Sequence, residues 1–199
     1  MEKFAFILHP LSLQDMEHLS PLMRYIPDPI IEACLKMKKP FKVSHITGIK
    51  SPYAEAEGWF IGCPLTAKQM VELPEEFVMD RIIESGKVAQ KLGAKIVGLG
   101  AFTSIVGDAG ITVAKNLDIA VTSGNSYTVA TAIQGTKQAA RMMGKALKEC
   151  RAVVVGATGS IGAASVRLLA KEVKHITLVA RHMGPLEELA QELIEQNHC

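Results

Sequence analysis

The stretch "AVVVGATGSIGAA" (152–164) constrains the fold of this chain more than any other segment. Its valine run predicts a buried parallel strand, and residues 163–171 predict a helix directly after the last glycine. Gly156, Gly159 and Gly162 lie between these elements at three-residue spacing. This order is typical of loops that hold a pyrophosphate, because backbone N–H groups and the helix dipole both point at the ligand. The sequence therefore predicts a nucleotide-binding strand–helix–strand unit.

Each residue of the loop has an expected role. Gly156 would allow the tight turn, Gly159 the close approach of a phosphate, and Gly162 the close packing of helix on strand. The hydroxyl groups of Thr158 and Ser160 could add further donors. The predicted pyrophosphate-binding residues are Gly156, Thr158, Gly159, Ser160, Ile161 and Gly162.

The second strand of this unit, residues 175–180, is followed by Arg181. An NAD site normally carries an acidic residue there, which accepts a hydrogen bond from the ribose 2′-OH. An arginine fits a 2′-phosphate instead, so NADP(H) is favoured over NAD(H). His182 could assist or stack on the adenine. The alternative is a plain scaffold whose glycine turn binds no cofactor.

Composition limits the class of protein. With 199 residues, 48% hydrophobic and 21% charged, the chain predicts one large or two small globular domains. A net charge of +2 gives no argument for nucleic acid. The apolar runs are too short to span a bilayer, and four scattered cysteines without a CxxC pair predict reduced thiols in a cytoplasmic protein.

Strand and helix patterns alternate along the chain, which predicts an α/β fold with largely parallel sheets. Strands are expected over 3–9, 41–49, 57–63, 94–106 and 117–124. Helices are expected from about residue 14, over 30–37, over 74–92 with Gly93 as C-terminal cap, after an Asp108 N-cap, and over 126–148. We divide the chain into an N-terminal α/β substrate domain (1–125), a connecting helix (126–149) and the first half of a Rossmann-type, doubly wound dinucleotide-binding domain (150–199).

The segment "VTSGNSYT" is a second candidate site. Ser123, Gly124 and Asn125 form the turn into the long helix, and Thr128 follows in its first turn. Hydroxyl, amide and backbone donors at a helix N-terminus can contact a substrate or a nicotinamide in a cleft. The alternative is that Asn125 or Ser126 is simply an N-cap.

Cysteine and histidine offer weaker candidates. Cys63 lies just after a predicted strand and fits a buried thiol better than a nucleophile, because no His or Lys adjoins it in sequence to lower its pKa. Cys199 is interpreted as a cut end. No metal site is expected, because no i,i+4 histidine pair occurs among His9, His18, His45, His175 and His198.

Short-chain dehydrogenases also carry a glycine-rich loop, near the start of the chain, with a Tyr and a Lys four residues apart well downstream. Here the last tyrosine, Tyr127, precedes the loop, and no tyrosine has a lysine at i+4. That class is excluded. A nucleotide domain placed after a substrate domain is instead the layout of the shikimate-dehydrogenase-like superfamily.

More closely, the chain resembles the long-chain acyl-carrier-protein reductases of cyanobacteria and bacterial relatives described as amino-acid or shikimate dehydrogenase-like. The resemblance rests on "FILHPLSLQDMEHL", "GLGAFTSIV" (98–106), "VTSGNSYTVATAI" (121–133) and "VVVGATGSIGAA". It implies reduction of a fatty acyl thioester to an aldehyde by NADPH, after a cysteine thiolate has taken the acyl group. Residues 98–106 could then form a wall of the acyl pocket, or else a buried strand with close-packed glycines.

In that family the nucleophilic cysteine lies far downstream of the glycine loop. We therefore expect the chain to be truncated within the nucleotide domain, without catalytic residues of its own, and inactive in isolation. An incomplete sheet would expose an edge, so association into a homo-oligomer stays open. A basic cluster could dock an acidic acyl carrier protein, or could be a solvated helix end: Lys36, Lys38, Lys39 and Lys42.

Two other functions remain open at this stage. The same scaffold could serve an NADP-dependent dehydrogenase of a small amino or hydroxy acid. It could also be a non-catalytic nucleotide-binding module.

Overall fold

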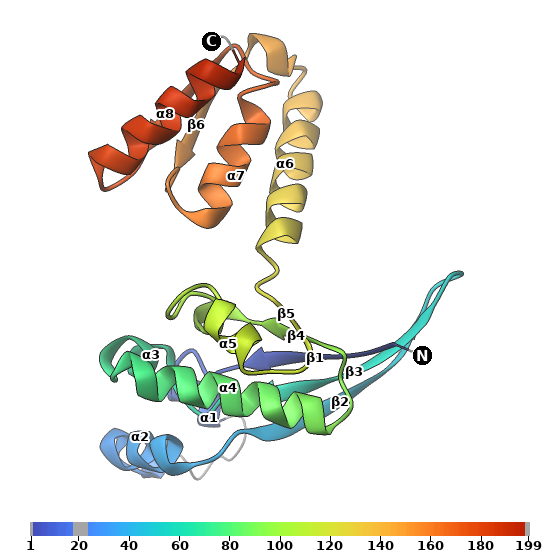
Figure 1. The fold of residues 1–199 in the computed structure, drawn as a ribbon, viewed down its shortest axis with the longest axis vertical. Helices are drawn as coiled ribbons and strands as arrows, with labels where there is room; N and C mark the ends of the chain where they lie inside the picture. The colour runs from blue at the N-terminus through green and yellow to red at the C-terminus, as the bar shows by residue number, and fades with distance from the viewer. Residues whose placement is uncertain (1, 18–23, 198–199) are drawn as a thin grey trace. The chain divides into compact units, whose positions relative to one another are not determined.

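A computed structural model describes residues 2–17 and 24–197 (Figure 1). The chain divides into two compact units, Met1–Gly124 and Asn125–Cys199. The sequence expectations for His18, His198 and Cys199 lie outside the described residues. In the described ranges no helix has the length and apolar character needed to cross a membrane.

The first unit is built on a five-stranded sheet of order β2-β3-β1-β4-β5. β1 is parallel to both β3 and β4, β4 is parallel to β5, and only β2 runs antiparallel to its neighbour β3. This mostly parallel sheet confirms the predicted α/β class. The strands are β1 (Glu2–Leu8), β2 (Phe41–Lys50), β3 (Glu55–Gly62), β4 (Ile96–Leu99) and β5 (Ala120–Thr122).

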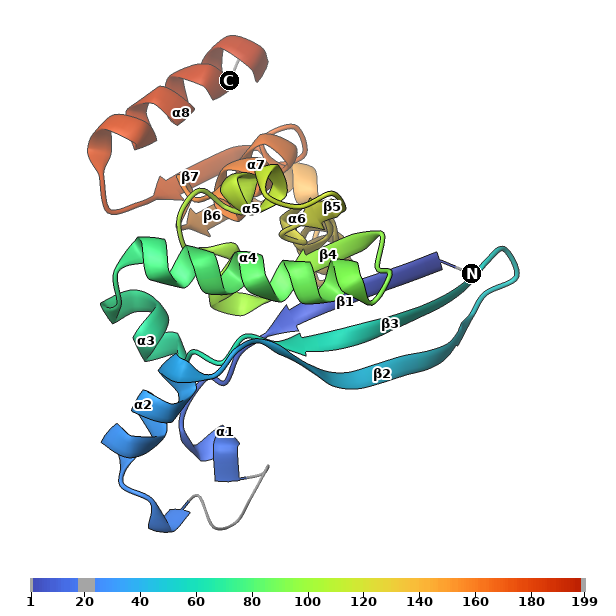
Figure 2. The same ribbon diagram turned by 60° about the horizontal axis from the view of Figure 1, so that its bottom comes forward.

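Helix α4 (Glu75–Lys91) lies across one face of this sheet (Figure 2). Apolar residues alternate along β1, β3 and β4, so one set of side chains from each strand packs beneath the helix. Fully buried members of this core include Ile7, Ile61, Val78, Ile82 and Val97. In the described part of this unit, the other α-helices are α1 (Gln14–Glu17), α2 (Asp28–Met37), α3 (Ala67–Glu72) and α5 (Ile111–Lys115).

The predicted C-terminal cap of α4 is present. Gly93 has φ +88°, a left-handed conformation that glycine adopts without steric cost. Its N–H donates to the carbonyl of Gln90 at 2.9 Å, and the N–H of Ala94 donates to Ala89 at 3.2 Å. These two bonds close the helix end in a glycine-centred cap.

The apolar segment 94–106, predicted as β structure, contains only a short strand. β4 ends at Leu99, and a 3₁₀ helix, η2 (Ala101–Ser104), follows. The N–H of Phe102 donates to Nε2 of His9 at 3.1 Å, in place of a carbonyl on a neighbouring strand. The prediction of β structure is therefore wrong beyond Leu99, because the backbone turns left-handed at Ala101 (φ +48°) and continues as a 3₁₀ helix.

Helix α5 begins later than predicted. Gly110, with φ +93°, occupies the N-cap position that the sequence assigned to Asp108. The Asp108 carboxylate nevertheless accepts the N–H of Thr112 at 2.9 and 3.0 Å and its hydroxyl at 2.7 Å. The carboxylate thus reaches the first turn from outside the helix. These bonds lower the pKa of Asp108, the backbone bond from Thr112 first.

The second unit contains two parallel strands, β6 and β7, and three long helices. Val154 and Ile176 face these helices, and one core joins them to Val129, Ile133 and Leu169. A second cluster adds Val166, Leu189 and Leu193. The elements are α6 (Asn125–Met142), η3 (Leu147–Glu149), β6 (Arg151–Val155), α7 (Ser160–Leu169), β7 (His175–Val179) and α8 (Met183–Asn197).

Helix α6 ends at Met142, not at residue 148 as predicted. Gly144 has φ +67°, its N–H donates to Arg141 at 3.0 Å, and the N–H of Lys145 donates to Ala140 at 2.9 Å. Glycine in this conformation ends helices, and its place in the sequence was the signal for the boundary. Because α6 packs on α7 and on both strands, it is part of the second unit and not a bare connector.

Two isoleucines on neighbouring strands test the core of the first unit. Ile61 is fully buried, whereas Ile49 is 44% exposed. We expect Ile61→Ala to lower the free energy of unfolding by about 2–5 kcal/mol, because it removes buried methyl groups and leaves a cavity. Ile49→Ala should change it by about 0.5 kcal/mol or less. Urea unfolding followed by circular dichroism measures both, and equal losses would contradict the assigned core.

Candidate functional site

The glycine loop joins β6 to α7 through a turn whose first position has a left-handed backbone, which favours glycine. Gly156 has φ +77°, and the N–H groups of Gly156 and Ala157 donate to the carbonyl of Val179 at 2.8 and 3.0 Å. Gly159 precedes the helix as its N-cap residue. The loop is therefore tied to the end of β7, and two of its N–H groups are already used.

Gly162 lies against the backbone of this turn. A Cβ at position 162 would overlap the carbonyl oxygen of Gly156 and would come within 2.8 Å of its carbonyl carbon and 3.1 Å of Ala157 Cα. Contacts this short to backbone atoms cannot be relieved by a side-chain rotation. Glycine at 162 thus lets α7 begin directly above the end of β6.

The N-terminus of α7 offers donors to a ligand. No side chain caps this helix, and the N–H groups of its first turn have no preceding helical carbonyl. Those groups belong to Ser160, Ile161 and Gly162. Thr158 and Ser160 are exposed beside them, so hydroxyl donors adjoin the same helix end. This arrangement suits a phosphate, because the helix dipole adds partial positive charge there.

The two glycine- and serine-containing stretches, far apart in sequence, meet at one hydrogen bond. Nδ2 of Asn125, the first residue of α6, donates to Oγ of Ser160 at 2.8 Å. Since this oxygen accepts from Asn125, the Ser160 hydroxyl proton remains available to a ligand. Thr128 lies one turn further along α6, exposed. From the sequence alone, these two stretches were predicted as separate sites.

Ser123 and Gly124 fall in the first unit. Gly124 has φ +74°, and its N–H donates to the Thr122 hydroxyl at 3.1 Å, which shapes the turn after β5. Arg181 and His182 follow the end of β7 and are both exposed. Because β6 and β7 are parallel, with Val155 paired to Val179, Arg181 lies at the same sheet edge as the glycine loop.

Cys63 and His9 line a different cavity, of about 350 Å³, beyond the ends of β1 and β3. The Cys63 side chain is fully buried, and burial raises the pKa of its thiol to about 11. Only the thiolate is nucleophilic, so this thiol is unreactive at neutral pH. His9 was not among the site residues predicted from the sequence. The signal that could have identified it is a polar residue directly after a buried strand.

His9 is 9% exposed, and both of its ring nitrogens have partners. Nδ1 is 3.0 Å from the Pro10 carbonyl, which can only accept, whereas Nε2 accepts the N–H of Phe102. These contacts assign the proton of the neutral ring to Nδ1. Burial lowers the pKa of His9, which keeps the ring neutral. His9 therefore holds η2, the segment after β4, in place.

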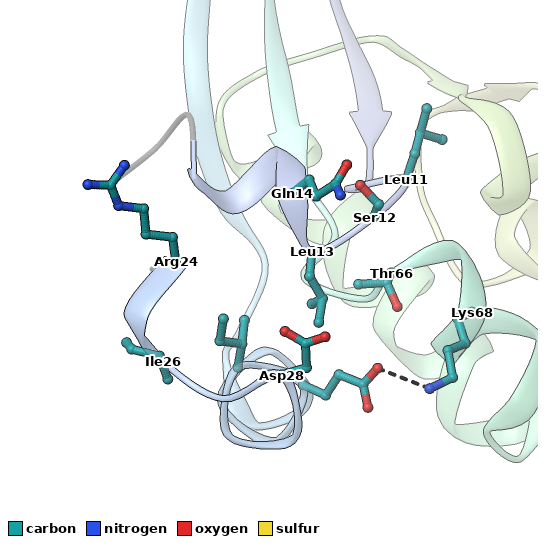
Figure 3. A pocket seen from close by; sticks show the side chains of 11 residues that line it. Leu11, Ser12, Leu13, Gln14, Arg24, Ile26, Asp28, Thr66 and Lys68 are labelled. Carbon is teal, nitrogen blue, oxygen red and sulfur yellow. Dashed lines mark hydrogen bonds and ion pairs between the residues drawn. The ribbon is translucent and has the colours of Figure 1, made fainter. Parts of the chain in front are cut away.

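A larger hollow of about 540 Å³ adjoins the first turn of α1 (Figure 3). Its lining includes Gln14, Asp28, Thr66 and Lys68. Nζ of Lys68 is 3.3 Å from the Glu32 carboxylate and so already has an anionic partner. Over residues 2–17 and 24–197, no group of three or more His, Cys, Asp or Glu side chains is arranged to hold a metal ion.

Comparison with known proteins gives distant matches. No protein-family model matches the chain. It is 27% identical over 209 residues to the long-chain acyl-[acyl-carrier-protein] reductase of Synechococcus elongatus, covering 96% of this chain and 59% of the reductase. The chain is distantly related to that reductase. It is also 32% identical over 157 residues to the aminotransferase PigE of a Serratia species, covering 78% of this chain and 18% of that protein.

The chain thus spans less than two thirds of either curated relative. Among solved structures, an aspartate racemase homologue from Pyrococcus horikoshii matches with a TM-score of 0.39 and 13% identity, over 98% of this chain and 71% of that one.

The assigned state of His9 predicts how stability depends on pH. Below the ordinary histidine pKa of about 6.5, the unfolded chain binds a proton at His9 that the folded chain does not. The neutral His9 ring therefore gives its full contribution to the free energy of unfolding above pH 6.5. That contribution is lost as the pH falls towards the lowered pKa of His9 in the folded chain. Urea unfolding should show this loss in the wild type and a smaller one in His9→Gln.

Nitrogen chemical shifts of His9 provide the direct measurement. They should report an Nδ1–H tautomer and a pKa below 6.5. An Nε2–H tautomer, or a pKa at or above that value, would contradict the assigned contacts.

Proposed function

We propose that this chain forms the substrate-binding unit and the first part of the NADP-binding unit of an enzyme that reduces a fatty acyl thioester to an aldehyde. The observation that carries the proposal is the uncapped N-terminus of α7 directly after the glycine turn. The distant relation to an acyl-carrier-protein reductase over 96% of the chain supports the choice of reaction.

The residues of the second unit fit a pyrophosphate. The contact of Gly162 with the Gly156 carbonyl leaves no room for a larger side chain, so the helix start and the turn form one close-packed cradle. The N–H groups of Ser160 and Ile161 lie at the positive end of the α7 dipole. The hydroxyl of Ser160, whose oxygen is fixed by Asn125, adds a directed donor.

Arg181 favours NADP(H) over NAD(H). It is exposed just beyond β7, where the ribose of a bound dinucleotide would lie. A guanidinium binds a 2′-phosphate through two parallel hydrogen bonds and gives a 2′-hydroxyl no comparable partner. His182 is exposed beside it and can stack on the adenine.

NADPH, when bound, would supply the hydride for the reduction. The residues of this chain contribute binding and orientation. The first turn of α7 and Ser160 hold the diphosphate, Asn125 orients the Ser160 hydroxyl, and Arg181 fixes the ribose end. Cys63 does not accept the acyl group, because its buried thiol stays protonated at neutral pH.

Nucleotide binding to the wild-type chain and to Arg181→Ala tests the proposal. We expect NADPH to bind more tightly than NADH. The variant should lose about 10- to 100-fold in NADPH affinity, the value of a hydrogen-bonded charge pair, with little change for NADH. Isothermal titration calorimetry measures both cofactors. Activity on acyl thioesters, with small amino and hydroxy acids as competing substrates, then tests the reaction.

Arg151→Ala is the matched control. Arg151 is also an exposed arginine of the strand pair, but it lies at the opposite end of β6. Equal binding of NADPH and NADH by the wild type, or an equal loss in both variants, would contradict the assigned cofactor.

A basic surface on the first unit supports an acidic carrier as partner. Lys36 lies in the last turn of α2, Lys38 and Lys39 follow the helix, and Lys42 is the second residue of β2; all four are exposed. Nζ of Lys38 lies 4.1 Å from the centre of the Phe41 ring. A cluster of one sign attracts an oppositely charged protein at long range and makes the encounter salt-dependent.

Charge reversal tests this docking surface. We expect Lys39→Glu with Lys42→Glu to weaken binding of an acyl carrier protein and to flatten its dependence on ionic strength, because attraction becomes repulsion. Lys87→Glu with Lys91→Glu, on exposed positions of α4, makes the same charge change elsewhere. Surface plasmon resonance at several salt concentrations measures both. An equal loss of carrier binding in the two double variants would show that overall charge, and not this cluster, attracts the carrier.

A further inference from the structure

Helix α2 carries two apolar stripes, and only one of them is buried. Ile31 and Leu35 face inward and form a small core beneath the helix. Ile30, Cys34 and Met37 follow the spacing i, i+4, i+7 and so lie along a second stripe of the same helix. Ile30 and Met37 are 53% and 81% exposed, and Cys34 is exposed between them. A surface helix normally places polar side chains on its outer side, so α2 departs from that pattern.

Exposed apolar residues continue into the segment before the helix. Tyr25 and Ile26 are 71% and 38% exposed. The Arg24 guanidinium lies over the Tyr25 ring, with 4.8 Å between Cζ and the ring centre, and Nη2 donates to the Tyr25 hydroxyl at 2.7 Å. In both views of the fold, α2 lies at the edge of the first unit (Figures 1 and 2). Four exposed side chains on or just before this helix form what we call the α2 patch: Tyr25, Ile26, Ile30 and Met37.

Cations flank the α2 patch at both ends of the helix. Between residues 24 and 42 there are five cationic side chains and two carboxylates, Asp28 and Glu32. Glu32 already contacts Nζ of Lys68 at 3.3 Å. Among the side chains that the structure describes, none of the five cations forms an ion pair, so no carboxylate neutralises them. These cations are Arg24, Lys36, Lys38, Lys39 and Lys42.

This charge pattern favours an anionic partner over a second copy of the chain. Arg24 lies at one end of the patch and the lysines at the other, so two patches laid face to face would bring cations against cations in either direction. Ile30 and Met37 line neither the 540 Å³ hollow nor the 350 Å³ cavity of this unit, so they project outward. Projecting side chains need matching pockets in a protein partner, whereas a fluid bilayer accepts them without any.

We propose that the α2 patch docks on an anionic lipid bilayer, with α2 parallel to the membrane surface. Ile26, Ile30 and Met37 enter the boundary between headgroups and acyl chains, where burial of their apolar surface stabilises the complex. Tyr25, with an apolar ring and a polar hydroxyl, suits the same depth. The flanking cations lie against the lipid phosphates. This inference goes beyond the proposed function and does not rest on it, because docking requires neither NADPH nor a thioester.

Flotation of the full 199-residue chain with lipid vesicles tests the docking. Vesicles of phosphatidylcholine with added phosphatidylglycerol should bind the chain. Binding should increase with the anionic fraction and decrease with ionic strength, because salt screens the attraction. Vesicles of phosphatidylcholine alone should bind it more weakly. Equal binding to both kinds of vesicle, or binding to neither, would overturn the proposal.

A matched pair of double variants locates the contact. Ile30→Asn with Met37→Gln should weaken binding to anionic vesicles about tenfold or more, because apolar surface no longer enters the bilayer. Ile194→Asn with Met183→Gln changes the same residue types on α8, where they are 52% and 63% exposed, and should leave binding unchanged. Unfolding curves confirm that both variants are folded. An equal loss in the two would show that the contact is not at α2.

Removal of charge tests the electrostatic part of the contact. Lys38→Gln with Lys39→Gln should weaken vesicle binding about fivefold for each lysine, because each cation near an anionic surface adds to the attraction. Lys87→Gln with Lys91→Gln, on exposed positions of α4, removes the same charge elsewhere and should have a smaller effect. If the two pairs lose binding equally, overall charge and not the α2 region holds the chain on the vesicle, and the proposal is wrong.

An acidic protein is the competing partner for this surface. If Ile30→Asn with Met37→Gln abolishes binding of an acyl carrier protein and the wild-type chain does not bind anionic vesicles, the patch is a protein interface and the bilayer proposal is wrong. NADPH titration reports separately on the proposed function. Failure of NADPH to bind, while the α2 and α8 variants still differ on vesicles, would leave the docking standing and the reductase assignment without support.

Discussion

Parallel pairing between neighbouring strands is the constraint on which both units depend. β1 lies between β3 and β4 and is parallel to both, and β6 is parallel to β7. Parallel strands end at the same edge, so the residues just beyond them are brought together whatever their separation in sequence. His9 and Cys63 meet in this way in the first unit. The glycine loop and Arg181 share an edge in the second.

Burial then decides the chemistry at each edge. In the first unit it keeps the Cys63 thiol protonated and the His9 ring neutral, which leaves an apolar cavity without a nucleophile. In the second unit the helix start is exposed and uncapped, so its N–H groups stay available to an anion. The edge of the second unit therefore suits an anionic group such as a phosphate.

Local signals made much of the fold predictable. The valine run before Gly156, the apolar run of β1 and the glycine after α4 each act within a few residues, and each was placed correctly. The capping box of Thr66 and Gln69 at the start of α3 was an equally local signal that the sequence reading missed. Gly144 was another, and it ends α6 earlier than predicted.

The sequence by itself determined the α/β class and the strand–glycine–helix order, because both follow from short-range periodicity and backbone conformation. Only the tertiary structure decided the contacts between distant residues. Nδ2 of Asn125 donates to Ser160, and His9 accepts the N–H of Phe102 beyond the end of β4. The cavity beside Cys63 likewise needs side chains from three separate segments. Such contacts depend on how strands pair and helices pack, and no single stretch of sequence contains that information.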